Sequence, residues 1–98
     1  MEDYRIWYNH AKEDLSAAKY NIKGRKYRIA AFLCQQAAEK ALKALHIKKI
    51  GKYPRIHDLV VLGEKVNVPE DLMNRMRVLN SVYIESRYPD PPTGEIFY

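Results

Sequence analysis

The stretch from Tyr27 to Lys49, YRIAAFLCQQAAEKALKALHIKK, decides how the rest of the chain must pack. When these residues are placed at about 100° per residue, the apolar side chains cover well over half of the helix circumference. A helix that is apolar over so wide an arc must be covered from two or more directions, and its many alanines let neighbouring backbones come close. The sequence therefore predicts the central helix of an all-α bundle.

Turn and capping residues set the boundaries of the other helices. Gly24 ends the first helix, Asp58 caps a short third helix, Pro69 opens the fourth and Pro89 ends it. Short connections make consecutive helices antiparallel neighbours, so we expect an up-and-down antiparallel bundle with a short third helix. The expected helices span residues 3–23, 27–49, 59–66 and 70–87, followed by an extended tail over 88–98.

Length and composition limit the class of protein. Ninety-eight residues are enough for one domain, so residues 1–98 are expected to form a single helical unit. The one cysteine, Cys34, excludes an internal disulfide and is consistent with a reducing compartment. The start, MEDYR, is acidic where a signal peptide is basic, and no apolar run approaches the roughly 20 residues of a membrane span. We expect a cytoplasmic protein with no membrane partner.

The charge pattern points to an acidic partner. The net charge is +5, but the segment from Lys19 to Arg55 holds eleven Lys and Arg against the single acid Glu39. A basic block of this kind suggests a polyanion such as a nucleotide, RNA or an acidic protein. The alternative interpretation is a solvated, Lys-rich surface that keeps a small protein in solution.

The polar residues of the central helix are the first candidates for a binding site. Lys40 falls within an apolar arc of this helix, where an ammonium group needs an acid, a phosphate or a route to solvent. Gln36 and Lys43 share its flank at spacings of four and three residues. In the alternative interpretation Lys40 reaches outward, Gln36 bonds within the bundle, and Asp14 and Glu39 are internal ion partners.

Two further candidates lie where helices begin and end. His57 and Asp58 stand at the start of the third helix, where free amides could bind an anion, but Asp58 as a cap would use those amides itself. His57 is either a packed loop residue or a general base. Arg87 ends the fourth helix and could form a local clamp with Asp90. Since no His and Cys spacing fits a metal and no Gly-rich phosphate loop occurs, we expect no metal or cofactor.

Four segments together resemble a known family: WYNHAKEDLSAAKY (7–20), QQAAEKALKAL (35–45), PRIHDL (54–59) and YIESRYPD (83–90). Over Tyr4 to Asp90 the chain is similar to the HEPN domain (higher eukaryotes and prokaryotes nucleotide-binding), of the stand-alone prokaryotic type. The resemblance implies an all-α bundle, usually dimeric, often encoded beside a small polymerase-β-like nucleotidyltransferase. Several branches are metal-independent RNases and toxins held by that partner. It also implies that Arg87 and Tyr88 line the groove between helices and touch the ligand or the partner.

The chain departs from the RNase branches in one motif. Those branches use an Arg-x4-6-His motif near the start of a late helix, whereas Arg87 has no His after it. We therefore expect a nucleotide-binding or interaction module, paired with a nucleotidyltransferase in a toxin–antitoxin type of context. The rival hypothesis is a metal-independent RNase or RNA-binding toxin, with His57 as base and Arg55 or Arg87 steadying the phosphate.

The resemblance also predicts self-association. Family members of full length continue beyond RYPD into one more long helix, whereas this sequence stops at Tyr98. Without that helix, one side of the central helix would expose alanine, leucine and tyrosine side chains to water. We therefore expect a homodimer in which the exposed faces of the first and central helices meet about a two-fold axis.

Overall fold

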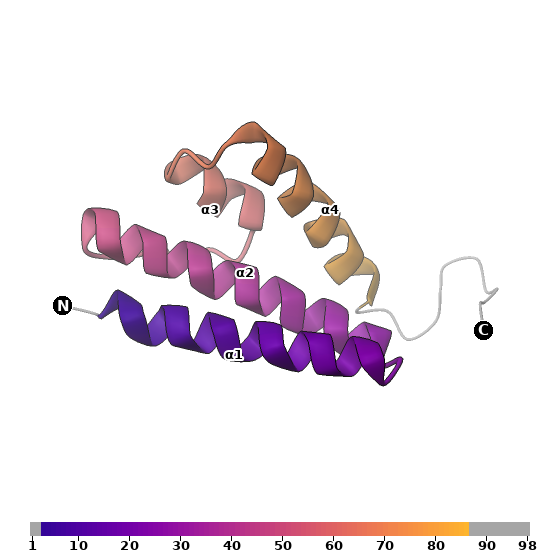
Figure 1. Cartoon of the computed structure of the whole chain (residues 1–98). Coiled ribbons are helices and arrows are strands. Elements are labelled where there is room, and N and C mark those ends of the chain that lie inside the picture. Colours follow the sequence, from indigo (N-terminus) through magenta and orange to yellow (C-terminus); the bar gives the residue numbers. More distant parts are fainter. Residues whose placement is uncertain (1–2, 87–98) are drawn as a thin grey trace.

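Two long antiparallel helices lie side by side, and two shorter helices pack against the second of them, on the side away from the first (Figure 1). The structure is a computed structural model that describes residues 3–86. These residues form α1 (Tyr4–Lys23), α2 (Tyr27–Ile50), α3 (Leu59–Lys65) and α4 (Glu70–Ser86). The all-α bundle predicted from the sequence is confirmed, and the helix bounds lie within a residue of the expected ones. The expected tail, 88–98, lies outside the described residues.

Local signals in the sequence explain where these helices start and stop. The side chain of Asp3 accepts a hydrogen bond from Arg5 N at 2.9 Å and caps α1. Gly51 ends α2 in the left-handed conformation, with φ 92°, which glycine adopts without steric cost. Asp58 caps α3 by accepting from the backbone of Val60 and Val61.

The central helix is covered from two directions, as its wide apolar arc requires. Toward α1, small residues are buried on both helices, so the two backbones approach closely. Toward α3, a separate core cluster contains Leu42, Leu59, Leu62 and Val66, with Met76 and Leu79 of α4 packed against it. α2 therefore touches every other helix, and its polar residues lie at the junctions between them.

Gly63 lets α4 pack closely on α3. A Cβ atom at this position would lie 2.8 Å from Met73 Sδ and 3.0 Å from Met76 Sδ, closer than van der Waals contact allows. The glycine weakens α3 by about 1 kcal/mol relative to alanine, but it leaves room for these two methionines. The contact between Gly63 and the two methionines fixes α4 against α3.

A row of apolar side chains on α1 stays exposed. Tyr8, Leu15 and Ile22 are 50%, 44% and 48% exposed, although they belong to the apolar side of the helix. Beside Tyr8, a groove of about 360 Å³ lies between α1 and α2, with Ala41 and Leu45 in its lining. No other part of residues 3–86 covers this surface, which we call the α1–α2 face.

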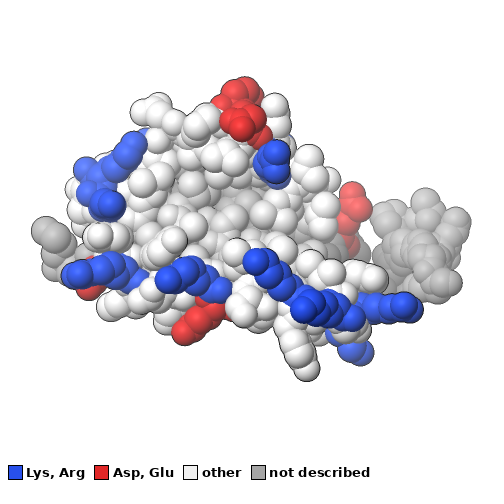
Figure 2. Space-filling view, in the orientation of Figure 1, with Lys and Arg blue, Asp and Glu red and all other residues white. Residues whose placement is uncertain are grey.

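Charge is spread unevenly over the molecule. Lys and Arg side chains line the edge formed by α1 and α2, while much of the surface between that edge and α4 is uncharged (Figure 2). Within residues 3–86, no helix is both long enough and apolar enough to cross a membrane.

Candidate functional site

A pocket of about 340 Å³ opens where α2, the α2–α3 loop and α4 meet. Polar side chains from all three segments converge on it, although the segments are far apart in the sequence. Its described lining consists of Gln35, Gln36 and Glu39 of α2, His57 and Asp58 at the end of the loop, and Asn80, Tyr83 and Ile84 of α4. We call it the His57 pocket.

The carboxylate of Glu39 holds the floor of this pocket together. Glu39 is only 6% exposed, and its Oε2 accepts from Lys43 Nζ at 2.8 Å and from His57 Nδ1 at 2.7 Å. Its Oε1 accepts from Gln35 Nε2 at 3.2 Å, and the same amide nitrogen donates to His57 O at 3.3 Å. A buried carboxylate needs such partners, and these bonds tie the loop to α2.

Lys43 brings α1 into the same network. Its side chain is buried, and Nζ lies 5.7 Å from the centre of the Trp7 ring and 5.2 Å from that of Tyr53. The two rings meet edge to face, with centroids 4.8 Å apart. The ammonium group is therefore stabilised by Glu39 on one side and by two aromatic faces on the other, so α1, α2 and the loop share one charged centre.

The environment of Glu39 keeps its carboxylate ionised. Burial acts to raise its pKa, but the hydrogen bonds from Lys43, His57 and Gln35 and the charge of Lys43 together outweigh burial and hold the pKa below its usual range. Glu39 is thus negatively charged at neutral pH.

His57 is fixed but exposed. Its side chain is 81% exposed, while the hydrogen bond from Nδ1 to Glu39 sets the orientation of the ring. Because a carboxylate only accepts, Nδ1 carries a proton, and in the neutral form of the ring Nε2 is left as an acceptor at the pocket mouth. Such a nitrogen can accept a hydrogen bond from a ligand or take a proton from one.

The structure separates the candidate residues of the central helix. Gln36 lines the pocket and donates to Gln35 Oε1 at 2.9 Å. Lys40 pairs with Asp14 of α1 at 2.7 Å, and Lys43 is enclosed by Glu39 and the two rings, so neither lines the pocket. Both ammonium groups thus have a carboxylate partner inside the chain.

The remaining candidates lie in the loop or beyond α4. Arg55 is exposed in the loop, two residues before His57. Asp58 caps α3, and its Oδ1 also accepts from Asn80 Nδ2 at 3.2 Å. The three candidates Arg87, Tyr88 and Asp90 lie outside the described residues.

Sequence reasoning did not assign several residues of the pocket to a site. Gln35 and Glu39 were noted among the polar residues of the central helix, but Gln35 was not chosen and Glu39 was treated as a possible ion partner, and Asn80 was not considered. A usable signal was the spacing of four residues from Gln35 to Glu39 and from Glu39 to Lys43, which puts all three on one side of α2. The approach of His57 and Asn80 from other segments has no comparable local signal.

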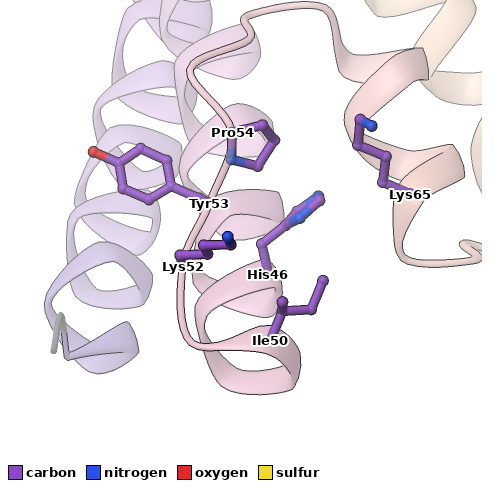
Figure 3. Close-up of a pocket in the computed structure, with 6 residues that line it drawn as sticks. All are labelled: His46, Ile50, Lys52, Tyr53, Pro54 and Lys65. Atoms are coloured by element: carbon purple, nitrogen blue, oxygen red, sulfur yellow. The ribbon is translucent and has the colours of Figure 1, made fainter.

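A larger cavity, of about 570 Å³, lies at the C-terminal end of α2, between that helix, the following loop and the end of α3 (Figure 3). Its lining includes the basic residues Lys52 and Lys65 and the buried His46, whose Nε2 lies 3.0 Å from Leu62 O. Nearby, Lys49 Nζ donates to Val66 O at 3.5 Å. Because the last carbonyls of two helices face this region, its lysines complement the negative ends of the helix dipoles. We assign these side chains to the fold.

The central role of Glu39 predicts a pH-dependent loss of stability. We expect Glu39→Gln to lower the free energy of unfolding at pH 7 by about 3–5 kcal/mol, because it leaves the buried charge of Lys43 uncompensated. The lowered pKa means that the ionised carboxylate stabilises the fold above its unfolded pKa of about 4.3, and that this contribution disappears as the pH falls through the folded pKa. The difference between variant and wild type should therefore shrink in acid.

Urea unfolding at a series of pH values between neutral and about pH 3 measures this difference. Glu64→Gln, on the exposed side of α3, is the matched control and should stay close to wild type throughout. Two results would contradict the role given to this carboxylate. One is a Glu39→Gln variant as stable as wild type at pH 7, and the other is a difference in the free energy of unfolding that stays constant as the pH falls.

Comparison with known proteins identifies the family. The HEPN domain matches residues 4–95, which is nearly the whole chain. The chain is also similar to TT1696 from Thermus thermophilus, with 39% sequence identity and a TM-score of 0.80 to its crystal structure. That match covers 91% of this chain and 72% of the other. No curated protein gave a match.

The match extends over all four helices and over every described segment that builds the His57 pocket. The resemblance in the four sequence segments and the similarity of the whole fold thus agree. The chain belongs to the HEPN family, a family of nucleotide-binding and RNase-type modules.

Proposed function

We propose that this HEPN protein is a nucleotide- or RNA-binding interaction module, and that ligands bind at the His57 pocket. The observation that carries the proposal is the exposed His57 ring, held at the pocket mouth by a buried, ionised Glu39. Burying a carboxylate that orients one loop histidine costs desolvation free energy. This cost indicates that the position of His57 serves a function. The exposed Lys and Arg side chains along α1 and α2 add a surface that attracts a polyanion (Figure 2).

The partner that fits the family is a polymerase-β-like minimal nucleotidyltransferase, in a toxin–antitoxin type of context. Two features of the surface support a protein partner of this kind. The exposed row of Tyr8, Leu15 and Ile22 is apolar, and the basic side chain of Lys12 lies beside it, with Nζ 5.0 Å from the centre of the Tyr8 ring. An apolar surface with a charged rim is typical of protein interfaces.

The rival function is that of a metal-independent RNase, and the bond between His57 and Glu39 favours it. A carboxylate that orients an imidazole is a recurring arrangement in general base catalysis. In this mechanism His57 Nε2 takes the proton of a ribose 2′-hydroxyl, and Arg55 stabilises the phosphate. We favour binding without cleavage, because the described lining of the pocket contains no Lys or Arg and no second histidine to protonate a leaving oxygen.

The α1–α2 face supports self-association as well. Several large apolar side chains are exposed there beside a groove of about 360 Å³. At about 25 cal/mol per Å², covering a few hundred Å² of apolar surface contributes several kcal/mol, which matters to a chain with a small core. We therefore include a homodimer in the proposal, with this face at its two-fold axis.

Binding to RNA tests the function directly. Fluorescence anisotropy with a labelled, structured RNA in EDTA should show binding without cleavage, and the affinity should fall steeply between about 50 and 200 mM salt. Arg55→Ala should reduce the slope of log K against log salt by about 1, because it removes one exposed cation beside the pocket. Arg75→Ala, an exposed cation on α4 outside the pocket lining, is the matched control and should leave the slope nearly unchanged.

The same RNA, analysed on a gel, separates the two functions. Intact RNA with salt-dependent binding supports the module. Cleavage in EDTA that is lost in His57→Ala identifies the RNase instead. Absence of any RNA or nucleotide binding at low salt contradicts both.

Light scattering tests self-association. We expect a dimer at micromolar concentration, and we expect Leu15→Glu to convert it to monomer, because a carboxylate in the centre of an apolar interface loses its water. Ser16→Glu, one residue away and also exposed, is the control and should remain dimeric. A substitution of Ala37 on α2 is less informative, since Ala37 is buried within the chain. A wild-type chain that stays monomeric at these concentrations rules out the homodimer.

A further inference from the structure

We infer that the His57 pocket recognises the base of a nucleotide through its exocyclic amino group, and that the phosphates remain outside the pocket. This inference rests on the proposed function and adds to it the part of the ligand that enters the site. It follows from the hydrogen-bonding capacity, the charge and the shape of the pocket.

The pocket offers a ligand one group that can only accept, the carboxylate of Asp58. Asp58 Oδ1 accepts from Val60 N, Val61 N and Asn80 Nδ2, which leaves Oδ2 open to a ligand. Asn80 uses one amide N–H in this bond and keeps its second N–H and its carbonyl oxygen.

Two more side chains offer polar groups to a ligand. Gln36 donates one N–H to Gln35 Oε1 and keeps its second N–H and its own oxygen, and the His57 ring presents Nε2 at the pocket mouth. Gln35 uses both N–H groups of its amide on Glu39 and His57 O. A ligand that satisfies the Asp58 carboxylate must therefore donate a hydrogen bond, while Asn80 and Gln36 can either donate or accept.

The charge of the pocket works against phosphate. Among the described lining residues there are two carboxylates, Glu39 and Asp58, and no Lys or Arg. The charge of Glu39 is compensated by Lys43, so the pocket is weakly acidic rather than strongly so. Asp58 also occupies the free amides at the start of α3, which removes the anion-binding groups expected there from the sequence. A phosphate finds a better environment outside, near the exposed Arg55.

The walls suit a flat ring. Tyr83 of the pocket lies beside Phe32, with ring centroids 6.0 Å apart, and the His57 ring lies at the mouth. Aromatic side chains are the usual surface on which a base stacks. The volume, about 340 Å³, lies at the small end of the range for ligand pockets, roughly 300–1,000 Å³, and matches a base or nucleoside better than a longer ligand.

These properties predict which bases are accepted. Adenine and cytosine carry an amino group on the edge that enters, whereas hypoxanthine and uracil present an oxygen at the same place. An oxygen facing the Asp58 carboxylate leaves this acceptor unpaired and adds repulsion. The affinity for adenine should exceed that for hypoxanthine by about tenfold or more, and the affinity for cytosine should exceed that for uracil by about the same factor.

Titration of the full-length chain with nucleosides tests this. With ¹⁵N-labelled protein, adenosine and cytidine should shift the signals of the pocket residues, with Kd values about tenfold or more below those of inosine and uridine. Pyrophosphate should not displace adenosine. Asn80→Ala should weaken adenosine binding about tenfold, whereas Asn74→Ala, on the exposed side of α4, should leave it unchanged. Circular dichroism establishes that both variants are folded.

The outcomes separate this inference from the function on which it rests. If RNA binds but nucleosides up to millimolar concentration do not, or if inosine binds as tightly as adenosine, base recognition is wrong while the binding function stands. The same holds if pyrophosphate displaces adenosine, or if N-acetyl-argininamide occupies the pocket more tightly than adenosine, which would make it a site for a cationic side chain. If neither RNA nor any nucleoside binds, both proposals fail.

Discussion

The carboxylate of Glu39 is the centre on which the rest of this structure depends. A buried negative charge must be surrounded by donors, and here they come from α2 itself and from the loop that follows it. Lys43 extends the network to α1 through the rings of Trp7 and Tyr53. One charged group thus fixes the relative positions of α1, α2 and the loop, and the same bonds hold His57 at the surface.

The helices could be predicted from the sequence because their signals are local. Gly24, Asp58 and Pro69 mark ends that depend on neighbouring residues alone, and the wide apolar arc of α2 indicated its central place. The ion pairs could not be assigned in the same way. Asp14 and Glu39 were both plausible partners for Lys40. The packing of α1 on α2 decides between them, since it brings Asp14 to Lys40, while Glu39 pairs with Lys43. His57 and Asn80 reach the pocket through tertiary packing, and the spacing of residues along the sequence does not reveal such contacts.

In the proposed function, two regions of the molecule share the binding of a nucleotide. Polar groups and aromatic rings line the pocket, and no Lys or Arg is among its described lining residues, whereas exposed Lys and Arg side chains lie along α1 and α2. Lys40 and Lys43 looked from the sequence like phosphate ligands, yet each is paired within the chain. The basic residues of α2 therefore serve two purposes, some holding the bundle together and others giving the surface its charge.

The measurement that tests this account most directly is the tautomer of His57, read by NMR from the ring nitrogens of the full-length protein. The bond of 2.7 Å to Glu39 predicts that the neutral ring carries its proton on Nδ1 and that Glu39→Gln removes this preference. His10, exposed on α1, serves as the internal reference. A neutral His57 with its proton on Nε2, indistinguishable from His10, would contradict the claim that Glu39 organises the site.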